Sequence, residues 1–332
     1  MNNSRKFEYG GYLPIETHFS NESQHYFKKQ GQNVQYLNCG RTCFYVAAKS
    51  ASIKKIYIPY FTCAETSQPF KDLGISIKFY KLDADLMPKG IELNKNEYLL
   101  WTNYYGNASK EMISLIEKKY SGRLIIDSCH AFYCPPIKGA FNCYSARKFI
   151  GVSDGAYLVT DLNIKPYSLK LIRDESYLHM GHLFKQIEEG TNEGYSLSLA
   201  NEKRLEKNYK LMSLTTEKIL SFINHSKIKE IRNKNFLELH SNLKSINNFP
   251  VNLNSGTQMY YPFKCKDHKL RDKLIKNRIY NPTWWRHVIN ELGERSVEGE
   301  YTLETVLLPI DQRYTIDDMK ILSDIVQNLI HI

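Results

Sequence analysis

Residues 123–160 read RLIIDSCHAFYCPPIKGAFNCYSARKFIGVSDGAYLVT, and this stretch decides the fold class. It contains two short runs rich in β-branched and aromatic residues, 123–127 and 155–160, which favour strands. Three earlier runs have the same character: IKKIYIP at 53–59, ISIKFYKL at 75–82 and EYLLWT at 97–102. Helical segments are expected after Thr62 and after Ser109, between these runs. This alternation predicts an α/β domain with a mostly parallel sheet.

The rest of the chain predicts further helices. The first is expected at about Arg41–Ala51, because the preceding NCG supplies a turn. After Thr160, five apolar residues with helical spacing predict one long amphipathic helix that could connect domains: Leu205, Tyr209, Met212, Ile219 and Ile223. Near the end, Thr315 and Asp318 have capping-box spacing ahead of a C-terminal amphipathic helix.

Strands and helices recur from about Lys234 onward, which predicts a second, smaller α/β unit. We therefore expect a large domain at 1–233, which includes the N-terminal segment and the connecting helix, and a small C-terminal domain at 234–332.

Composition excludes several classes of protein. The 332 residues are 42% hydrophobic and 24% charged, which is not the composition of a disordered, collagen-like or disulfide-scaffold chain. No apolar run approaches the ~18 residues of a membrane helix, and residues 1–16 lack the apolar core of a signal peptide. We expect a cytoplasmic protein without a membrane association. The charge of +10 is spread among 35 acidic residues, so a nucleic-acid partner is not expected. Seven cysteines without a Cys-x-x-Cys pair predict free thiols and no metal site.

A first candidate site lies at Asn38-Cys39-Gly40-Arg41-Thr42. A glycine followed by polar residues at a helix start exposes backbone N–H groups, which together with the helix dipole suit a phosphate. Glycine is also common at the start of helices that bind no ligand. This fragment alone therefore fits either a phosphate site or an ordinary helix start.

A second candidate is Asp127, at the end of an apolar strand, with His130 three residues later. The carboxyl ends of parallel strands are where α/β folds usually bind ligands. A carboxylate among apolar neighbours needs a partner, and a cationic nitrogen of a ligand would serve. The alternative is an aspartate that caps a loop and a histidine with a structural role.

The third candidate is Ser145-Ala146-Arg147-Lys148. Ser-x-x-Lys is the nucleophile motif of serine β-lactamases, but the partner motifs of those enzymes are absent here. Lys148 fits a Schiff-base lysine better, because a partly buried amine beside Arg147 has its charged form disfavoured and attacks carbonyls more readily. A phosphate turn, a strand-end aspartate, a nearby histidine and this lysine together indicate a site for pyridoxal phosphate (PLP). If 139–145 is a strand, Arg147 should point away from the ring and hold a neighbouring loop or a partner subunit.

Taken together, these motifs resemble the DegT/DnrJ/StrS family of PLP-dependent sugar aminotransferases, in a branch whose lysine segment reads Ser-x-Arg-Lys. The resemblance runs from EYGGYLPIE to the last helix, and its motifs are NCGRT, IPYFTCAET, TNYYG, IIDSCHAFY, SARKFIGVSDGAYL, NPTWW and LLPIDQRYTIDDMK. It implies the fold type I architecture: a large domain with a mostly parallel central sheet and a small C-terminal α/β domain.

The resemblance also implies roles for single residues. Lys148 would carry the cofactor and shuttle a proton, and Asp127 would keep the pyridinium nitrogen protonated. His130 would lie beside the ring hydroxyl. The phosphate would be bound by Gly40, by the backbone of Arg41 and Thr42 and by the Ser145 hydroxyl. Cys63 stands where many relatives have an aromatic residue on the ring.

The implied reaction transfers an amino group from a donor such as glutamate to a keto sugar, in a homodimer with shared active sites. The family's partner-subunit asparagine has no convincing equivalent in NEGYSLSLA. Aromatic residues that could line a substrate cleft or pack in the core are Tyr104, Tyr105, Trp284 and Trp285, and Tyr12 and Arg286 are further candidate substrate contacts. Alternatives are a dehydratase, which retention of Lys148 disfavours, transfer to a non-sugar ketone, or a non-catalytic PLP-binding regulatory protein.

Overall fold

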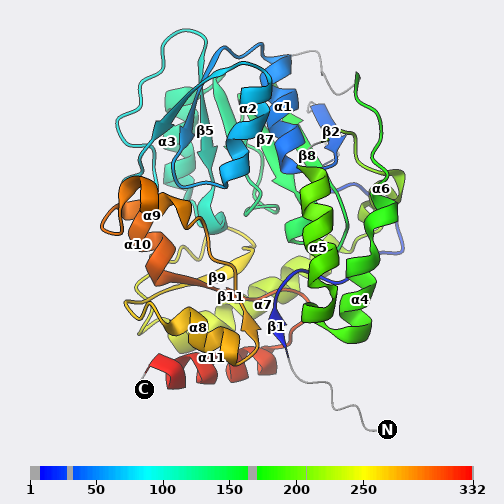
Figure 1. Cartoon of the computed structure of the whole chain (residues 1–332), viewed down its shortest axis with the longest axis vertical. Helices are drawn as coiled ribbons and strands as arrows, with labels where there is room; N and C mark the ends of the chain where they lie inside the picture. Colours follow the sequence, from blue (N-terminus) through cyan, green and yellow to red (C-terminus); the bar gives the residue numbers. More distant parts are fainter. Residues whose placement is uncertain (1–7, 28–32, 164–169, 207, 331–332) are drawn as a thin grey trace.

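The computed structural model describes residues 8–27, 33–163, 170–206 and 208–330. At its centre is a seven-stranded sheet in the order β2-β8-β7-β6-β5-β3-β4 (Figure 1). β4, β3, β5, β6 and β7 are parallel, and β8 is antiparallel to both of its neighbours. The strands are β2 (Asn33–Leu37), β3 (Lys55–Pro59), β4 (Ser76–Tyr80), β5 (Glu97–Thr102), β6 (Leu124–Asp127), β7 (Ala140–Ser145) and β8 (Ala156–Thr160).

The mixed α/β fold with a mostly parallel sheet confirms the predicted fold class, and all five predicted strand runs are strands. The strand that precedes Lys148 also forms, as β7. Strand β2, at the edge of the sheet, was not predicted, because in its sequence NVQYL the buried side chains are Gln35 and Leu37, and only Leu37 is apolar.

Helices cover both faces of the sheet. Leu100 and Ile125 pack toward α1 (Gly40–Ser50) and α2 (Gln68–Asp72), whereas Leu99 and Ile126 pack toward α3 (Lys110–Tyr120). This alternation is the two-residue period of strands that are buried on both faces. The predicted helices after residues 40, 62 and 109 are therefore confirmed, and the Ser109 side chain caps α3 by accepting the Met112 N–H at 3.2 Å.

The predicted long helix through Leu205 and Ile223 is wrong. Helix α5 (Thr191–Leu205) ends where that helix was to begin, and α6 (Leu214–Ser221) starts after an extended segment. In that segment Lys210 accepts the Asn38 N–H at 3.0 Å, and the Met212 N–H bonds Tyr36 O at 3.1 Å. These bonds satisfy the free edge of β2, which a helix could not do.

The chain then forms a second group of elements below the sheet in Figure 1. Residue 234 lies inside helix α7 (His225–Leu243), and the division into domains at that residue stays a prediction. The remaining elements are α4 (Gly181–Glu189), β1 (Tyr9–Gly10), β9 (Tyr260–Lys264), α8 (Leu270–Lys276), β10 (Ile279–Tyr280), α9 (His287–Leu292), α10 (Val297–Glu304), β11 (Thr305–Pro309) and α11 (Ile316–Ile330). No helix in the described part of the chain is long and apolar enough to cross a membrane.

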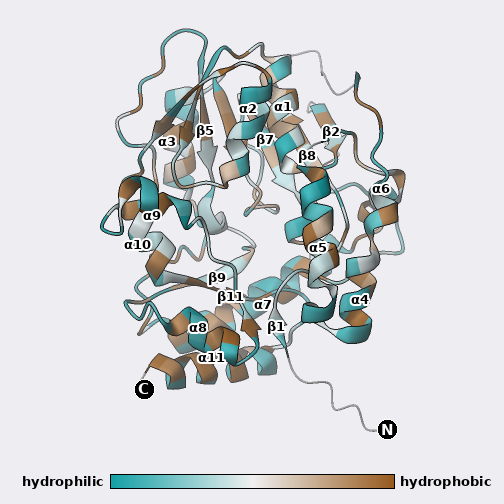
Figure 2. Cartoon of the chain, viewed as in Figure 1, coloured by the Kyte–Doolittle hydropathy of each residue, from teal (hydrophilic) through white to brown (hydrophobic). Residues whose placement is uncertain are grey.

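The C-terminal helix α11 has the predicted capping box. The Thr315 N–H bonds Asp318 Oδ2 at 2.7 Å, and the Asp318 N–H bonds Thr315 Oγ1 at 3.3 Å. Apolar and hydrophilic residues alternate along the helix (Figure 2), and Met319, Leu322 and Val326 are fully buried against β9 and β11.

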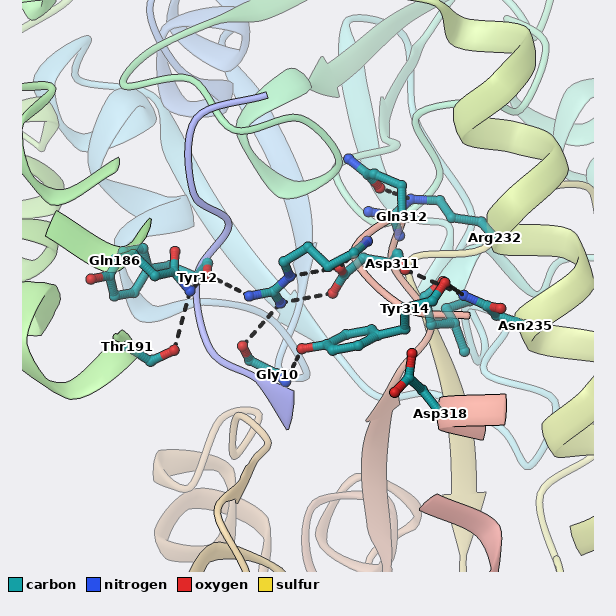
Figure 3. A network of polar contacts seen from close by, with 12 residues as sticks. Gly10, Tyr12, Gln186, Thr191, Arg232, Asn235, Asp311, Gln312, Tyr314 and Asp318 are labelled. Atoms are coloured by element: carbon teal, nitrogen blue, oxygen red, sulfur yellow. Dashed lines mark hydrogen bonds and ion pairs between the residues drawn. The ribbon is translucent and has the colours of Figure 1, made fainter. Parts of the chain in front are cut away.

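The N-terminal segment ties these parts together (Figure 3). The Gly10 N–H donates to Tyr314 Oη at 2.7 Å, while Gln186 Nε2 of α4 donates to Tyr12 O at 2.6 Å. Further along, the Glu16 N–H bonds Gly151 O at 3.2 Å, directly after the Lys148 turn. The segment therefore connects the C-terminal elements, α4 and the candidate site.

Gly151 is expected to be irreplaceable for a steric reason. A Cβ atom at this position would lie 1.5 Å from Pro14 O, so Gly151→Ala must displace the N-terminal segment. We expect the free energy of unfolding to fall by about 1–3 kcal/mol, measured by denaturant unfolding. Gly181→Ala is the matched control, because its Cβ would meet only Leu197 Cδ1 at 3.6 Å. Equal stability of the two variants would contradict this contact.

Candidate active site

One cavity of about 310 Å³ gathers most of the predicted site residues. It lies at the carboxyl ends of β6 and β7, and it is also lined by the start of α1, by α5, by the N-terminal segment and by C-terminal loops. The predicted residues that line it are Tyr12, Gly40, Arg41, Cys63, Asp127, His130, Ser145, Lys148 and Trp285. Thr42, Tyr105 and Arg286 are not among its lining residues.

Helix α1 opens toward the cavity at Gly40. A Cβ there would lie 2.9 Å from Cys129 Sγ, so the close approach requires glycine. The first turn has no acidic residue and the N-cap Cys39 makes no side-chain cap bond, which leaves the positive end of the helix dipole uncompensated locally. The Thr42 N–H bonds Cys39 O at 3.1 Å and its hydroxyl donates to Asn38 Oδ1 at 2.5 Å. Thr42 is thus engaged within the protein, and Gly40 and Arg41 face the cavity.

Asp127 ends β6 at the floor of the cavity. Its side chain is buried, and Oδ1 accepts the Cys129 N–H at 3.0 Å. Burial, together with the Asp127 charge, raises the pKa of the Cys129 thiol, which therefore stays neutral beside it. The hydrogen bonds from the Cys129 backbone and thiol leave the carboxylate able to bind a cationic partner in the cavity.

Lys148 and His130 meet across the cavity. The lysine Nζ lies 3.1 Å from His130 Nε2. Burial lowers the pKa of His130 well below its usual value, and the Lys148 charge adds to this effect, so the ring is neutral. A neutral ring that accepts through Nε2 carries its proton on Nδ1, and this buried Nδ1 has no partner within the described residues. His130 thus has an unsatisfied donor beside the lysine.

An aromatic stack closes one side of the cavity. The Trp284 ring lies on His130 with centroids 4.0 Å apart and 13° between planes, and Tyr105 stacks on Trp284 at 5.0 Å. Tyr105, a predicted substrate contact, is buried in the core behind this wall and does not line the cavity. Arg286, another predicted contact, is exposed and does not line the cavity either. Trp285 lines the cavity with a left-handed φ of 63°.

Cys63 lines the cavity as a neutral thiol. Burial, and its 2.5 Å hydrogen bond to Glu65 Oε2, raise the Cys63 pKa to about 11.

The predicted orientation of Arg147 is wrong. Strand β7 ends at Ser145, and residues 146–148 form a 3₁₀ turn, so side chains no longer alternate and Arg147 lines the same cavity as Lys148. Arg147 does hold a neighbouring element, because Nη2 contacts Glu202 of α5.

Several cavity residues had no signal in the sequence. Five of them come from segments outside the quoted motifs: His182, Ser198, Glu202, Arg232 and Tyr260. Asp311 lies within LLPIDQRYTIDDMK but was not singled out as a site residue. Within the part of the chain that the structure describes, no group of three or more His, Cys, Asp or Glu side chains could hold a metal ion.

The lowered pKa of His182 predicts how the free energy of unfolding depends on pH. Burial, with the charge of Arg147 adding, lowers the pKa of His182 to about 4. The unfolded chain therefore binds more protons than the folded one between about pH 6.5 and pH 4, so stability falls as the pH falls through this window. We expect His182→Gln to flatten the pH dependence of Tm over this range relative to the native chain. An unchanged slope would contradict a neutral, buried His182.

No protein-family model and no curated protein matches this sequence. Solved structures match most of the chain. PseC from Helicobacter pylori, an aminotransferase involved in the biosynthesis of pseudoaminic acid, is 12% identical, with 97% of this chain and 99% of that chain covered at a TM-score of 0.63. A DegT DnrJ EryC1 StrS aminotransferase from Brucella abortus is 13% identical, with 89% and 85% covered at a TM-score of 0.59.

NtdA from Bacillus subtilis, solved with bound cofactor PMP, is 11% identical, with 90% of this chain and 73% of that chain covered at a TM-score of 0.58. Sequence identities this low show a similar fold and nothing about chemistry. The chemistry of this chain depends on the residues of its cavity. The chain has the fold type I architecture of the DegT, DnrJ, EryC1 and StrS aminotransferases, as its motifs predicted.

Proposed function

We propose that this chain is a PLP-dependent aminotransferase of the DegT/DnrJ/StrS family, which moves an amino group from an amino acid such as glutamate to a keto sugar, in nucleotide-linked form. The observation that carries the proposal is the convergence of Lys148, Asp127 and the start of α1 on one cavity. These groups come from three separate segments of the sequence, and each matches one functional part of a single cofactor.

The cavity residues fit the cofactor at each of its polar groups. The positive end of α1 at Gly40 and the buried Ser145 hydroxyl suit the phosphate. Asp127 suits the pyridinium nitrogen, and the unsatisfied Nδ1–H of His130 suits the ring oxygen. Lys148 is exposed into the cavity, where its amine can meet a carbonyl carbon.

The residues of this chain would then act as follows. Bound PLP would supply an electron sink for the pair left when a substrate C–H bond breaks. Asp127 would hold a proton on the ring nitrogen, which keeps that sink effective. The Lys148 amine would take the proton from the substrate carbon and hold it for its return. His130, which is neutral, orients this amine without competing for the proton.

The keto-sugar acceptor is supported by the aromatic wall of the cavity. Trp285 lines it and Trp284 stacks on His130, which gives apolar ring faces beside polar groups.

We also propose a homodimer. Helices α4 and α5 expose a set of large apolar side chains that are 38–54% accessible: Phe184, Ile187, Tyr195, Leu197 and Leu199. Exposed large apolar residues on two packed helices are typical of an interface, and α5 also lines the cavity through Ser198 and Glu202. A second copy on this face would close the cavity to water. Sedimentation should show a dimer that Leu199→Glu dissociates, and a native monomer would contradict it.

We also propose a cytoplasmic location, which the free cysteine thiols support. All seven cysteines are free, as expected for a reducing compartment.

The test of the function is the half reaction with an amino donor. The purified protein loaded with PLP should change from pyridoxal-type to pyridoxamine-type absorbance when glutamate is added, and a keto sugar should reverse the change. A PLP-binding regulatory protein would show cofactor absorbance that no amino acid alters. A protein that takes up no PLP would contradict the proposal itself.

A further inference from the structure

Two arginines line the cavity at the end where α1 begins. Arg41 lies in the first turn of α1, and Arg147 lies in the 3₁₀ turn between Ser145 and Lys148. The Nε atom of each guanidinium group is buried and has no hydrogen-bond partner within the described residues. A buried unpaired N–H costs free energy, so each arginine has a donor that a ligand in the cavity could satisfy.

Glu202 shows that this end of the cavity stabilises negative charge. Its carboxylate contacts Arg147 Nη2. Burial alone would raise the pKa of Glu202, but the charges of Arg147, Arg41 and Lys148 hold it below its usual value. Both guanidinium groups therefore act on the same small volume, although Glu65 also interacts with Arg41 and Asp154 with Arg147.

The Ser145 hydroxyl adds a third polar group to this end. Ser145 is 5% exposed and lines the cavity. In the sequence it stands after Arg41 and two residues before Arg147. A phosphate dianion carries close to two negative charges at neutral pH, whereas a helix N-terminus supplies only about half of one positive charge. The helix start and a hydroxyl alone would leave most of that charge unbalanced in a buried site.

We infer that Arg41 and Arg147 clamp the phosphate of the cofactor, and that Glu202 holds the Arg147 guanidinium in place for this contact. The inference rests on the proposed function and deepens it. Planar guanidinium groups bind phosphate through two parallel N–H donors, which fixes orientation as well as charge. Both arginines of the clamp come from this chain's own motifs, NCGRT and SARK.

The experiment compares two probes that differ only in the phosphate: PLP and pyridoxal. Dissociation constants are measured by absorbance for the native chain, Arg41→Gln, Arg147→Gln and Arg147→Lys. We expect each Gln variant to bind PLP about 10- to 100-fold more weakly, while its affinity for pyridoxal changes less than about threefold. Arg147→Lys should lie between, because it keeps the charge and loses the paired donors.

Arg173→Gln is the matched control, because this half-exposed arginine pairs with Glu217 and does not line the cavity. It should leave both affinities unchanged. If the Arg147→Gln protein does not fold, Arg147→Lys and Arg41→Gln provide the same comparison.

Two results would overturn the clamp: equal weakening of PLP and pyridoxal binding, which would mean that the arginines only support the fold, or no weakening of either. These differ from failure of the proposed function, in which the native chain would bind neither probe.

Discussion

Replacing Asp127 with asparagine should lower the turnover of the half reaction with glutamate by at least ~100-fold, equivalent to about 2.7 kcal/mol of transition-state stabilisation. Asparagine keeps the shape of the side chain and can still accept the Cys129 N–H. It cannot hold a proton on a pyridine nitrogen by charge, so the electron sink weakens when it is needed most. The loss should fall on the rate, with PLP still bound.

The control for this variant is Asp161→Asn. Asp161 follows β8, which runs antiparallel to β7. It therefore lies at the end of the strands opposite to the cavity, where Oδ1 accepts the Gly139 N–H at 2.9 Å. Its replacement should leave turnover unchanged. Turnover of Asp127→Asn within a factor of three of the native value would mean that Asp127 has only a structural role.

Lys148→Arg should have the largest effect and reduce turnover by ~1,000-fold or more, because it removes both the nucleophilic amine and the proton carrier. A guanidinium group stays protonated and does not attack a carbonyl, although it keeps the positive charge in the cavity. PLP should then bind without a covalent link, which is measured by its loss on dialysis.

Lys138→Arg makes the same chemical change at an exposed lysine just before β7. It should retain full turnover and retain PLP on dialysis. Retention of PLP and of turnover by Lys148→Arg would show that another amine carries the cofactor.

The sequence predicted the central strands well because buried parallel strands are short apolar runs whose signal is local. It did not predict β2 or the extended segment at 210–212. Strand β2 forms because it pairs with β8, and the extended segment forms because it bonds the outer side of β2, as in the Asn38 and Met212 hydrogen bonds. The apolar residues of that segment happen to have helical spacing, which is why a long helix was expected there.

The candidate site was predictable where chemistry follows a strand end or a helix start. Asp127 ends β6, Lys148 follows β7, and Gly40 begins α1, so local rules place all three at one edge. The orientation of Arg147 was not predictable, because the chain leaves the strand at Ser145 and turns. Its partner Glu202 is 55 residues away, and only the packing of α5 against the cavity brings them together.

The central claim is that Lys148 carries the cofactor in this cavity, and reduction with borohydride followed by peptide mapping tests it most directly. The native chain loaded with PLP should carry one pyridoxyl group, on the peptide that contains Lys148. A pyridoxyl group on any other lysine, or none at all, would contradict the account.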